Sequence, residues 1–151
     1  EMNVIHITGR GKELRVLREQ GTGYVSVEYL EDGMEDVYAA ADLVLCRAGL
    51  GTISELSRLS KSAIVIPLPH SAQEKNAQLL YQHDAARVLL QEETTSSQLL
   101  EEIRSLMQDS SGREQMARRM HDLVRTDVGE EMIQIIEQIA YNHGMHLQSH
   151  T

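Results

Sequence analysis

The residue types best suited to chemistry gather in one stretch, which directly follows an apolar run and opens a helical pattern. Gly49 and Gly51 would let a ligand approach the backbone closely, and the unpaired N–H groups at a helix start favour a diphosphate. Thr52 and Ser54 add hydroxyl donors. Glu55, about one turn into the helix, would accept two hydrogen bonds from the adjacent hydroxyls of a ribose. The stretch therefore predicts a nucleotide-binding loop.

The same residues also fit a purely structural interpretation. Thr52-Ile53-Ser54-Glu55 matches a capping box, in which Thr52 is the N-cap and Glu55 reaches back to its backbone N–H. Arg47 suits an anchor that holds the loop through carbonyl or carboxylate contacts. Cys46 is expected to be a small buried apolar group, because the sequence places no histidine partner near it. The residues alone leave both interpretations of Glu55 open.

A second polar segment follows the next apolar run along the chain. Pro67 and Pro69 end that run, and Gln73 and Asn76 lie in the first turn of the helical pattern behind it. A side-chain amide offers both donors and an acceptor to the hydroxyls of a sugar. Because ligands of parallel α/β sheets bind at the carboxyl ends of the strands, we expect both segments at one edge of a sheet.

These segments need a parallel sheet to position them, and the apolar pattern predicts one. Short strands are expected at 4–7, 24–27, 43–46, 63–66 and 87–90, separated by helices at 12–19, 34–41, 52–60 and 73–83. The runs Leu43–Cys46 and Ala63–Ile66 are apolar on both faces, as in a sheet that helices cover on both sides. The fold class predicted is α/β, a Rossmann-like doubly wound parallel sheet.

The last third of the chain changes to helices. They are expected at 98–108, 113–125 and 130–141. We therefore predict a Rossmann-like nucleotide-sugar-binding core at 1–96, C-terminal helices of the same domain at 97–141, and a flexible tail at 142–151. The helix at 113–125 carries arginines beside Met116 and Met120, and we favour packing within the protein over contact with lipid.

Composition narrows the class of protein. The chain has 151 residues and a net charge of −9, which argues against a nucleic-acid partner. One cysteine excludes a disulfide framework and fits a reducing, cytoplasmic setting. No apolar run approaches the roughly 20 residues of a membrane span. Three histidines in the tail, at 143, 146 and 150, lack a scaffold for a metal, so no metal site is expected.

The two loop segments together resemble one family. The residues Ala41-Asp42-Leu43-Val44-Leu45-Cys46-Arg47-Ala48-Gly49, Thr52-Ile53-Ser54-Glu55-Leu56, Pro67-Leu68-Pro69-His70 and Gln73-Glu74-Lys75-Asn76-Ala77 are similar to the C-terminal domain of the MurG glycosyltransferases, in glycosyltransferase family 28. The resemblance runs from about Val4 to about Leu90, with looser agreement in the helices beyond.

The resemblance implies a GT-B fold and inverting transfer of GlcNAc from UDP-GlcNAc, with no metal or other cofactor. Leu30 would then sit by the uracil, Glu55 would take the ribose hydroxyls and Gln73 the GlcNAc hydroxyls, with Asn76 close behind. Arg47 and Gly49 would frame the loop. The diphosphate and ribose would be lined by Leu50, Gly51, Thr52, Ile53 and Ser54.

The resemblance also implies parts that this sequence does not contain. The family's first strand with its Gly-Gly-Ser-type loop, and the N-terminal acceptor-binding domain with the catalytic base, have no counterpart here, so no catalytic residue is assigned. The expected partners are a UDP-sugar donor, that acceptor domain or subunit, and a lipid-linked acceptor. The full enzyme would lie peripherally on the cytoplasmic face of the bacterial inner membrane.

Two other functions remain open at this point. The chain would also suit a non-catalytic donor-binding subunit of a split glycosyltransferase. Alternatively, it would suit the donor domain of a related glycosyltransferase with another sugar or lipid acceptor, because acceptor specificity belongs to the other domain. Lys61-Ser62, which stands where the family usually has Leu-Pro, and a short loop before Gln73 are departures from the family pattern.

Overall fold

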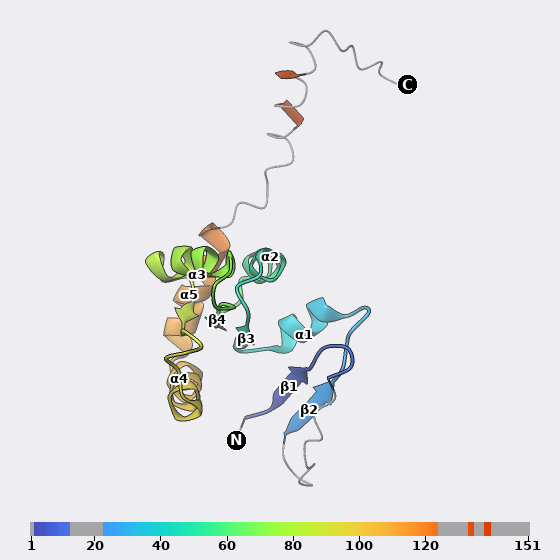
Figure 1. The fold of residues 1–151 in the computed structure, drawn as a ribbon, viewed down its shortest axis with the longest axis vertical. Coiled ribbons are helices and arrows are strands. Elements are labelled where there is room, and N and C mark those ends of the chain that lie inside the picture. Colours follow the sequence, from blue (N-terminus) through green and yellow to red (C-terminus); the bar gives the residue numbers. More distant parts are fainter. Residues whose placement is uncertain (1, 13–22, 124–132, 135–137, 140–151) are drawn as a thin grey trace. The chain divides into compact units, whose positions relative to one another are not determined.

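The computed structural model describes residues 2–12, 23–123, 133–134 and 138–139. From β2 onward, strands and helices alternate before two final helices (Figure 1). The order of the described elements is β1 (Val4–Ile7), β2 (Tyr24–Val27), α1 (Met34–Ala40), β3 (Val44–Cys46), α2 (Leu50–Arg58), β4 (Ala63–Val65), α3 (Gln73–Gln82), β5 (Arg87–Val88), α4 (Ser96–Gln108) and α5 (Ser110–Leu123). All five predicted strands are confirmed. The helix expected at 12–19, most of that at 130–141 and the tail at 142–151 lie outside the described residues.

The chain forms two compact units, Glu1–Asp42 and Leu43–Thr151. In the first unit, β1 pairs in parallel with β2, with Val4 opposite Tyr24 and Ile7 opposite Val27. Shortly after β1, the chain turns at Gly9, whose φ of +90° is a conformation that L side chains rarely adopt. Glycine at this position is therefore required by the turn.

The second unit is built on a three-stranded parallel sheet in the order β3-β4-β5. Its central strand β4 is inaccessible to solvent at Ala63, Ile64 and Val65. The apolar run predicted this burial on both faces, and the parallel pairing makes α2 and α3 crossover connections. Residues from β4, α4 and α5 share one core cluster, consisting of Ile64, Leu106 and Met116.

The boundary between α4 and α5 differs from the prediction. A loop was expected at 109–112, but only Asp109 separates the helices. Asp109 Oδ1 accepts from the Gly112 N–H at 2.8 Å, and a Cβ at Gly112 would collide with that carboxylate. Arg113 Nη1 donates to the carbonyl oxygens of Leu106 and Met107 at 2.5 and 2.7 Å. These side-chain contacts replace the loop with a tight corner.

Helix α5 packs against α2 and α4. Met116 and Met120 are buried, which confirms that this helix packs within the protein. Ser57 Oγ on α2 donates to the His121 carbonyl at 3.3 Å, and His121 Nδ1 lies 3.0 Å from the Ser57 carbonyl. Among the described residues, no helix is long and apolar enough to cross a membrane.

Replacing Leu56 on α2 tests the core of the second unit. Leu56 is fully buried, so Leu56→Ala is expected to lower the free energy of unfolding by about 2–5 kcal/mol. Leu79 on α3 is 47% exposed, so Leu79→Ala is expected to change it by less than about 0.5 kcal/mol. Urea unfolding followed by circular dichroism measures both. Equal effects of the two substitutions would contradict the assignment of the core.

Candidate functional site

The candidate site lies in the second unit, where β3 and β4 end. The segment after β3 leads into α2, and the segment after β4 leads into α3. Since β3 and β4 are parallel neighbours, with Cys46 opposite Val65, both segments leave the same edge of the sheet. The structure thus brings together the two segments that the sequence marked for ligand binding.

Helix α2 begins earlier than predicted, and this overturns the capping-box interpretation. The N-cap is Gly49, in an extended conformation with φ −70° and ψ 139°, and no side chain caps the helix. The Ile53 N–H donates to the Gly49 carbonyl at 3.0 Å, which makes Thr52 the third helical residue instead of the N-cap. Glu55 is therefore not the capping-box partner of Thr52.

The start of α2 presents free backbone donors. The N–H groups of Leu50, Gly51 and Thr52 precede the first intrahelical hydrogen bond, so no carbonyl of the helix accepts from them. No atom beyond the neighbouring residues and the helix backbone lies within 4 Å of a Cβ placed on Gly51, so the space beside it is open. The macrodipole adds partial positive charge at this end. These are the properties that an anion site needs.

The side chains in the first turns of α2 differ in how far they are available to a ligand. Ser54 Oγ donates to the Leu50 carbonyl at 2.9 Å, so its proton is used within the helix. Thr52 is half-buried, whereas Glu55 is exposed to solvent. Ile53 is buried and contributes to the core, so of its groups only the backbone suits a ligand contact.

Two polar side chains fasten the loops to each other. Arg47 Nη1 donates to the carbonyl oxygens of Ile66 and Pro67, both at 3.2 Å. Asn76 Nδ2 on α3 donates to the carbonyl oxygen of Ala48 at 3.0 Å, and Ala48 is fully buried. The anchoring role considered for Arg47 is therefore present, and Asn76 has a similar one. Sequence reasoning did not find the acceptors, because a backbone carbonyl carries no residue-type signal.

Gln73 also takes part in the loop that precedes its helix. Its Oε1 accepts from the Leu68 N–H at 3.1 Å, and its own N–H donates to Ser71 Oγ at 3.2 Å. Ser71 Oγ in turn donates to the Leu68 carbonyl at 2.7 Å. The amide nitrogen of Gln73 donates no hydrogen bond to the other described residues, so it keeps two donors for a ligand.

Cys46 and Leu30 are the other residues for which the sequence predicted a role. Burial raises the pKa of the Cys46 thiol from 9.0 to about 11, so the group stays protonated at neutral pH. A neutral thiol is a poor nucleophile, as the sequence predicted.

Leu30 belongs to the first unit, in the segment between β2 and α1, and is half-buried. Leu30 is therefore not among the residues of the second unit that form the candidate site.

Comparison with known proteins decides the family. A model of the glycosyltransferase family 28 C-terminal domain matches residues 1–139. The chain belongs to this family. A relative from Paenarthrobacter aurescens, named a UDP-N-acetylglucosamine–N-acetylmuramyl-(pentapeptide) pyrophosphoryl-undecaprenol N-acetylglucosamine transferase, is 34% identical over 142 residues. That match spans 89% of this chain and 37% of the relative.

Two further proteins are similar to this chain in sequence or in fold. A relative of the same name from Caldanaerobacter subterraneus is 36% identical over 109 residues, which are 70% of this chain and 30% of the relative. The crystal structure of MurG from Acinetobacter baumannii superposes with a TM-score of 0.77 at 23% identity, over 90% of this chain and 40% of that one. The predicted α/β fold of a GT-B C-terminal domain is confirmed. The chain spans less than half the length of these relatives.

Replacing Asn76 tests the link between the two loops. Asn76→Ala would leave the buried Ala48 carbonyl without this donor, so the free energy of unfolding should fall by about 1–3 kcal/mol. Amide hydrogen exchange at Ile53, whose N–H donates to the Gly49 carbonyl, should accelerate, because the loop before α2 loses a tether. Lys75→Ala, at the exposed neighbouring position, should change neither quantity. Unaltered exchange in Asn76→Ala would contradict the tethering role.

Proposed function

We propose that this chain is the donor-binding part of an inverting family 28 glycosyltransferase that transfers GlcNAc from UDP-GlcNAc to a lipid-linked acceptor in peptidoglycan synthesis. The observation that carries the proposal is the open start of α2, where the N–H groups of Leu50, Gly51 and Thr52 have no acceptor among the described residues. The names of the relatives supply the sugar and the acceptor class.

The helix start would act mainly on the leaving group. In glycosyl transfer, negative charge grows on the diphosphate of UDP as the bond to the anomeric carbon breaks. Backbone N–H groups fixed by the α2 helix meet this charge without reorganising, and they are worth more against the transition state than against the ground state. Arg47 and Asn76 support these donors indirectly, by holding the loop through backbone carbonyls.

The remaining donor contacts follow the family resemblance. Glu55, exposed on α2, would accept from the ribose hydroxyls, and the free amide nitrogen of Gln73 would donate to the sugar. Leu30 would contact the uracil through its backbone. The catalytic base and the lipid-linked acceptor would belong to the acceptor domain, which the chain would meet at the cytoplasmic face of the membrane.

Glu55→Gln tests the ribose contact. The substitution keeps the size of the side chain but turns charged hydrogen bonds into neutral ones, a loss of about 1–2 kcal/mol. UDP affinity of the isotope-labelled chain, followed by amide shifts, should therefore fall about tenfold. The melting temperature should change little, because Thr52 and Glu55 form no capping box. Glu114→Gln on α5 removes the same charge as a control. Unchanged UDP affinity in Glu55→Gln would exclude the ribose contact.

Chelation tests the proposed absence of a metal requirement. The described residues contain no group of three or more His, Cys, Asp or Glu that could hold a metal ion. A diphosphate held by backbone N–H groups and a helix start needs no bridging cation. The UDP affinity of the chain should be equal with EDTA and with added Mg²⁺. A large loss of affinity on chelation would show that a cation takes part in donor binding.

A further inference from the structure

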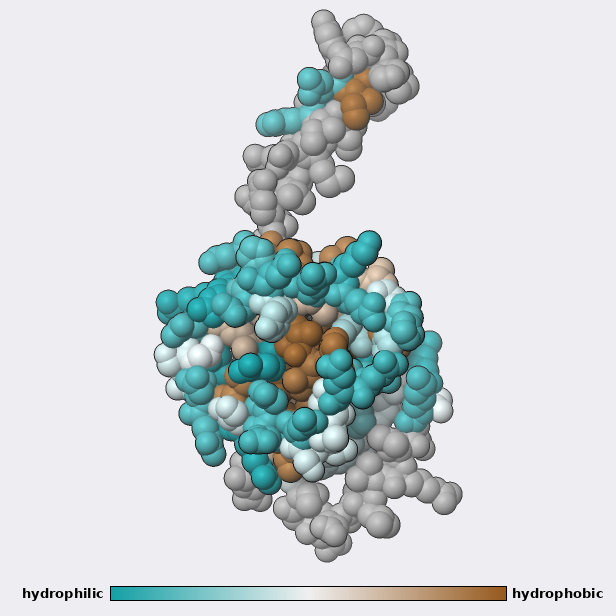
Figure 2. Space-filling model, turned by 60° about the vertical axis from the view of Figure 1, so that its left-hand side comes forward, coloured by the Kyte–Doolittle hydropathy of each residue, from teal (hydrophilic) through white to brown (hydrophobic). Residues whose placement is uncertain are grey.

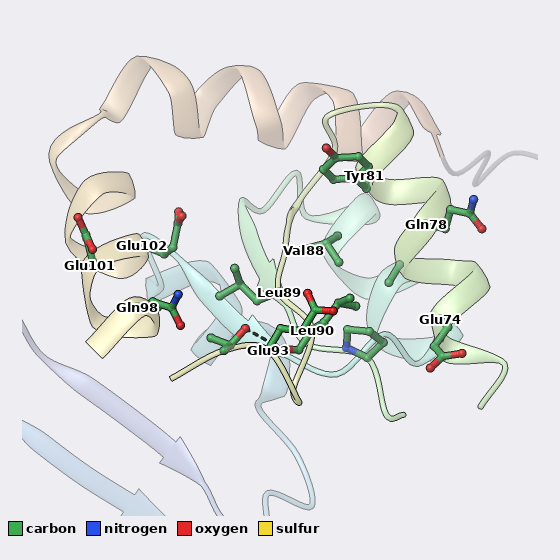
Figure 3. Close-up of a pocket in the computed structure, with 13 residues that line it drawn as sticks. Glu74, Gln78, Tyr81, Val88, Leu89, Leu90, Glu93, Gln98, Glu101 and Glu102 are labelled. Carbon is green, nitrogen blue, oxygen red and sulfur yellow. Dashed lines mark hydrogen bonds between the residues drawn. The ribbon is translucent and has the colours of Figure 1, made fainter. Parts of the chain in front are cut away.

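A groove on the second unit lies outside the proposed donor contacts. It is a cavity of about 780 Å³ between α3, β5 and α4 (Figure 3). The apolar part is formed by Pro67, Ala77, Tyr81, Val88, Leu89 and Leu90. Tyr81 is 68% exposed and Leu90 is 47% exposed. An apolar hollow ringed by hydrophilic side chains is visible when this side of the molecule faces the viewer (Figure 2).

Carboxylates surround the apolar floor of this groove. Glu74, Glu93, Glu101 and Glu102 all line it, and they come from α3, the β5–α4 loop and α4. Glu102 forms an ion pair with Arg87 at 3.2 Å, and Glu74 accepts from the His70 N–H at 2.9 Å. The side chains of Glu93 and Glu101 have no polar partner among the described residues. Among the described residues, no ion pair neutralises these two carboxylates, so they add negative charge to the rim.

The negative charge of the rim determines which classes of molecule can bind in the groove. Anionic lipid headgroups and nucleic acid would both be repelled by the rim. An apolar segment flanked by Lys or Arg would instead bury its apolar side chains on the floor and place its charges beside Glu93 and Glu101. Charge complementarity therefore points to a cationic, amphipathic polypeptide.

The edge of the sheet indicates how such a segment would lie. Among the described strands, β5 pairs with β4 alone, and the Leu89 N–H donates to the Val65 carbonyl at 3.0 Å. Backbone groups alternate in direction along a strand, so those of Val88 point away from β4. Val88 also lines the groove. An extended segment can pair with this free edge while its side chains enter the cavity.

We propose that the groove between α3 and α4 is a docking site for an extended segment of another protein, with apolar side chains flanked by Lys or Arg. The segment adds to the edge of β5 and pairs its cations with Glu93 and Glu101. This interaction surface is separate from the proposed donor contacts at α2, so it does not depend on the activity of the full enzyme.

A synthetic peptide of alternating Lys and Val serves as the probe. Titrated into the isotope-labelled chain, it should shift the amide signals of Val88, Leu89, Leu90 and Gln98, and its affinity should fall at high salt. A peptide of alternating Glu and Val should bind about tenfold more weakly or not at all. Spermine, which is cationic but lacks apolar side chains, should not reproduce the shifts at Val88 and Leu89.

A pair of charge-matched variants completes the test. Glu93→Gln with Glu101→Gln should weaken the Lys-Val peptide about tenfold. Glu114→Gln with Asp122→Asn removes the same charge from α5, which contributes no residue to the groove, and should leave the affinity nearly unchanged. Equal loss in both double variants, equal binding of the Glu-Val peptide, or shifts confined to other surfaces would overturn the proposal. UDP binding, measured in parallel, reports on the donor site separately.

Discussion

The burial of β4 on both faces is the constraint from which the rest of the second unit follows. Ala63, Ile64 and Val65 have no solvent-accessible surface, so the sheet needs covering layers on both sides. The two right-handed crossovers run in the same direction along the sheet, so α2 and α3 cover one face. Helices α4 and α5 contribute Leu106 and Met116, which pack with Ile64. The parallel pairing makes the segments after β3 and β4 leave one edge of the sheet. The candidate site is thus a consequence of how the core is covered.

Hydrogen bonds from long side chains to backbone carbonyls then decide the shape of this edge. Arg47 reaches the carbonyls of Ile66 and Pro67, which follow β4, and Asn76 reaches the buried carbonyl of Ala48. Each of these hydrogen bonds satisfies a loop carbonyl oxygen that accepts no hydrogen bond from the backbone of a described strand or helix. Gly49, which follows Ala48, is extended, which is the conformation that an N-cap needs. The residues that present backbone donors and the residues that hold them in place are therefore different sets.

The sequence by itself determined the five strands, the parallel α/β class and the two segments at the sheet edge, because apolar periodicity reports directly which residues a covered sheet must bury. It did not determine that α2 starts at Leu50, since Thr52-Ile53-Ser54-Glu55 satisfies a local capping rule equally well. Only the tertiary structure decided which acceptors the side chains of Arg47 and Asn76 contact. Their acceptors are backbone carbonyls 19 to 28 residues away, and such groups are identical at every position of the sequence until folding brings one of them within reach.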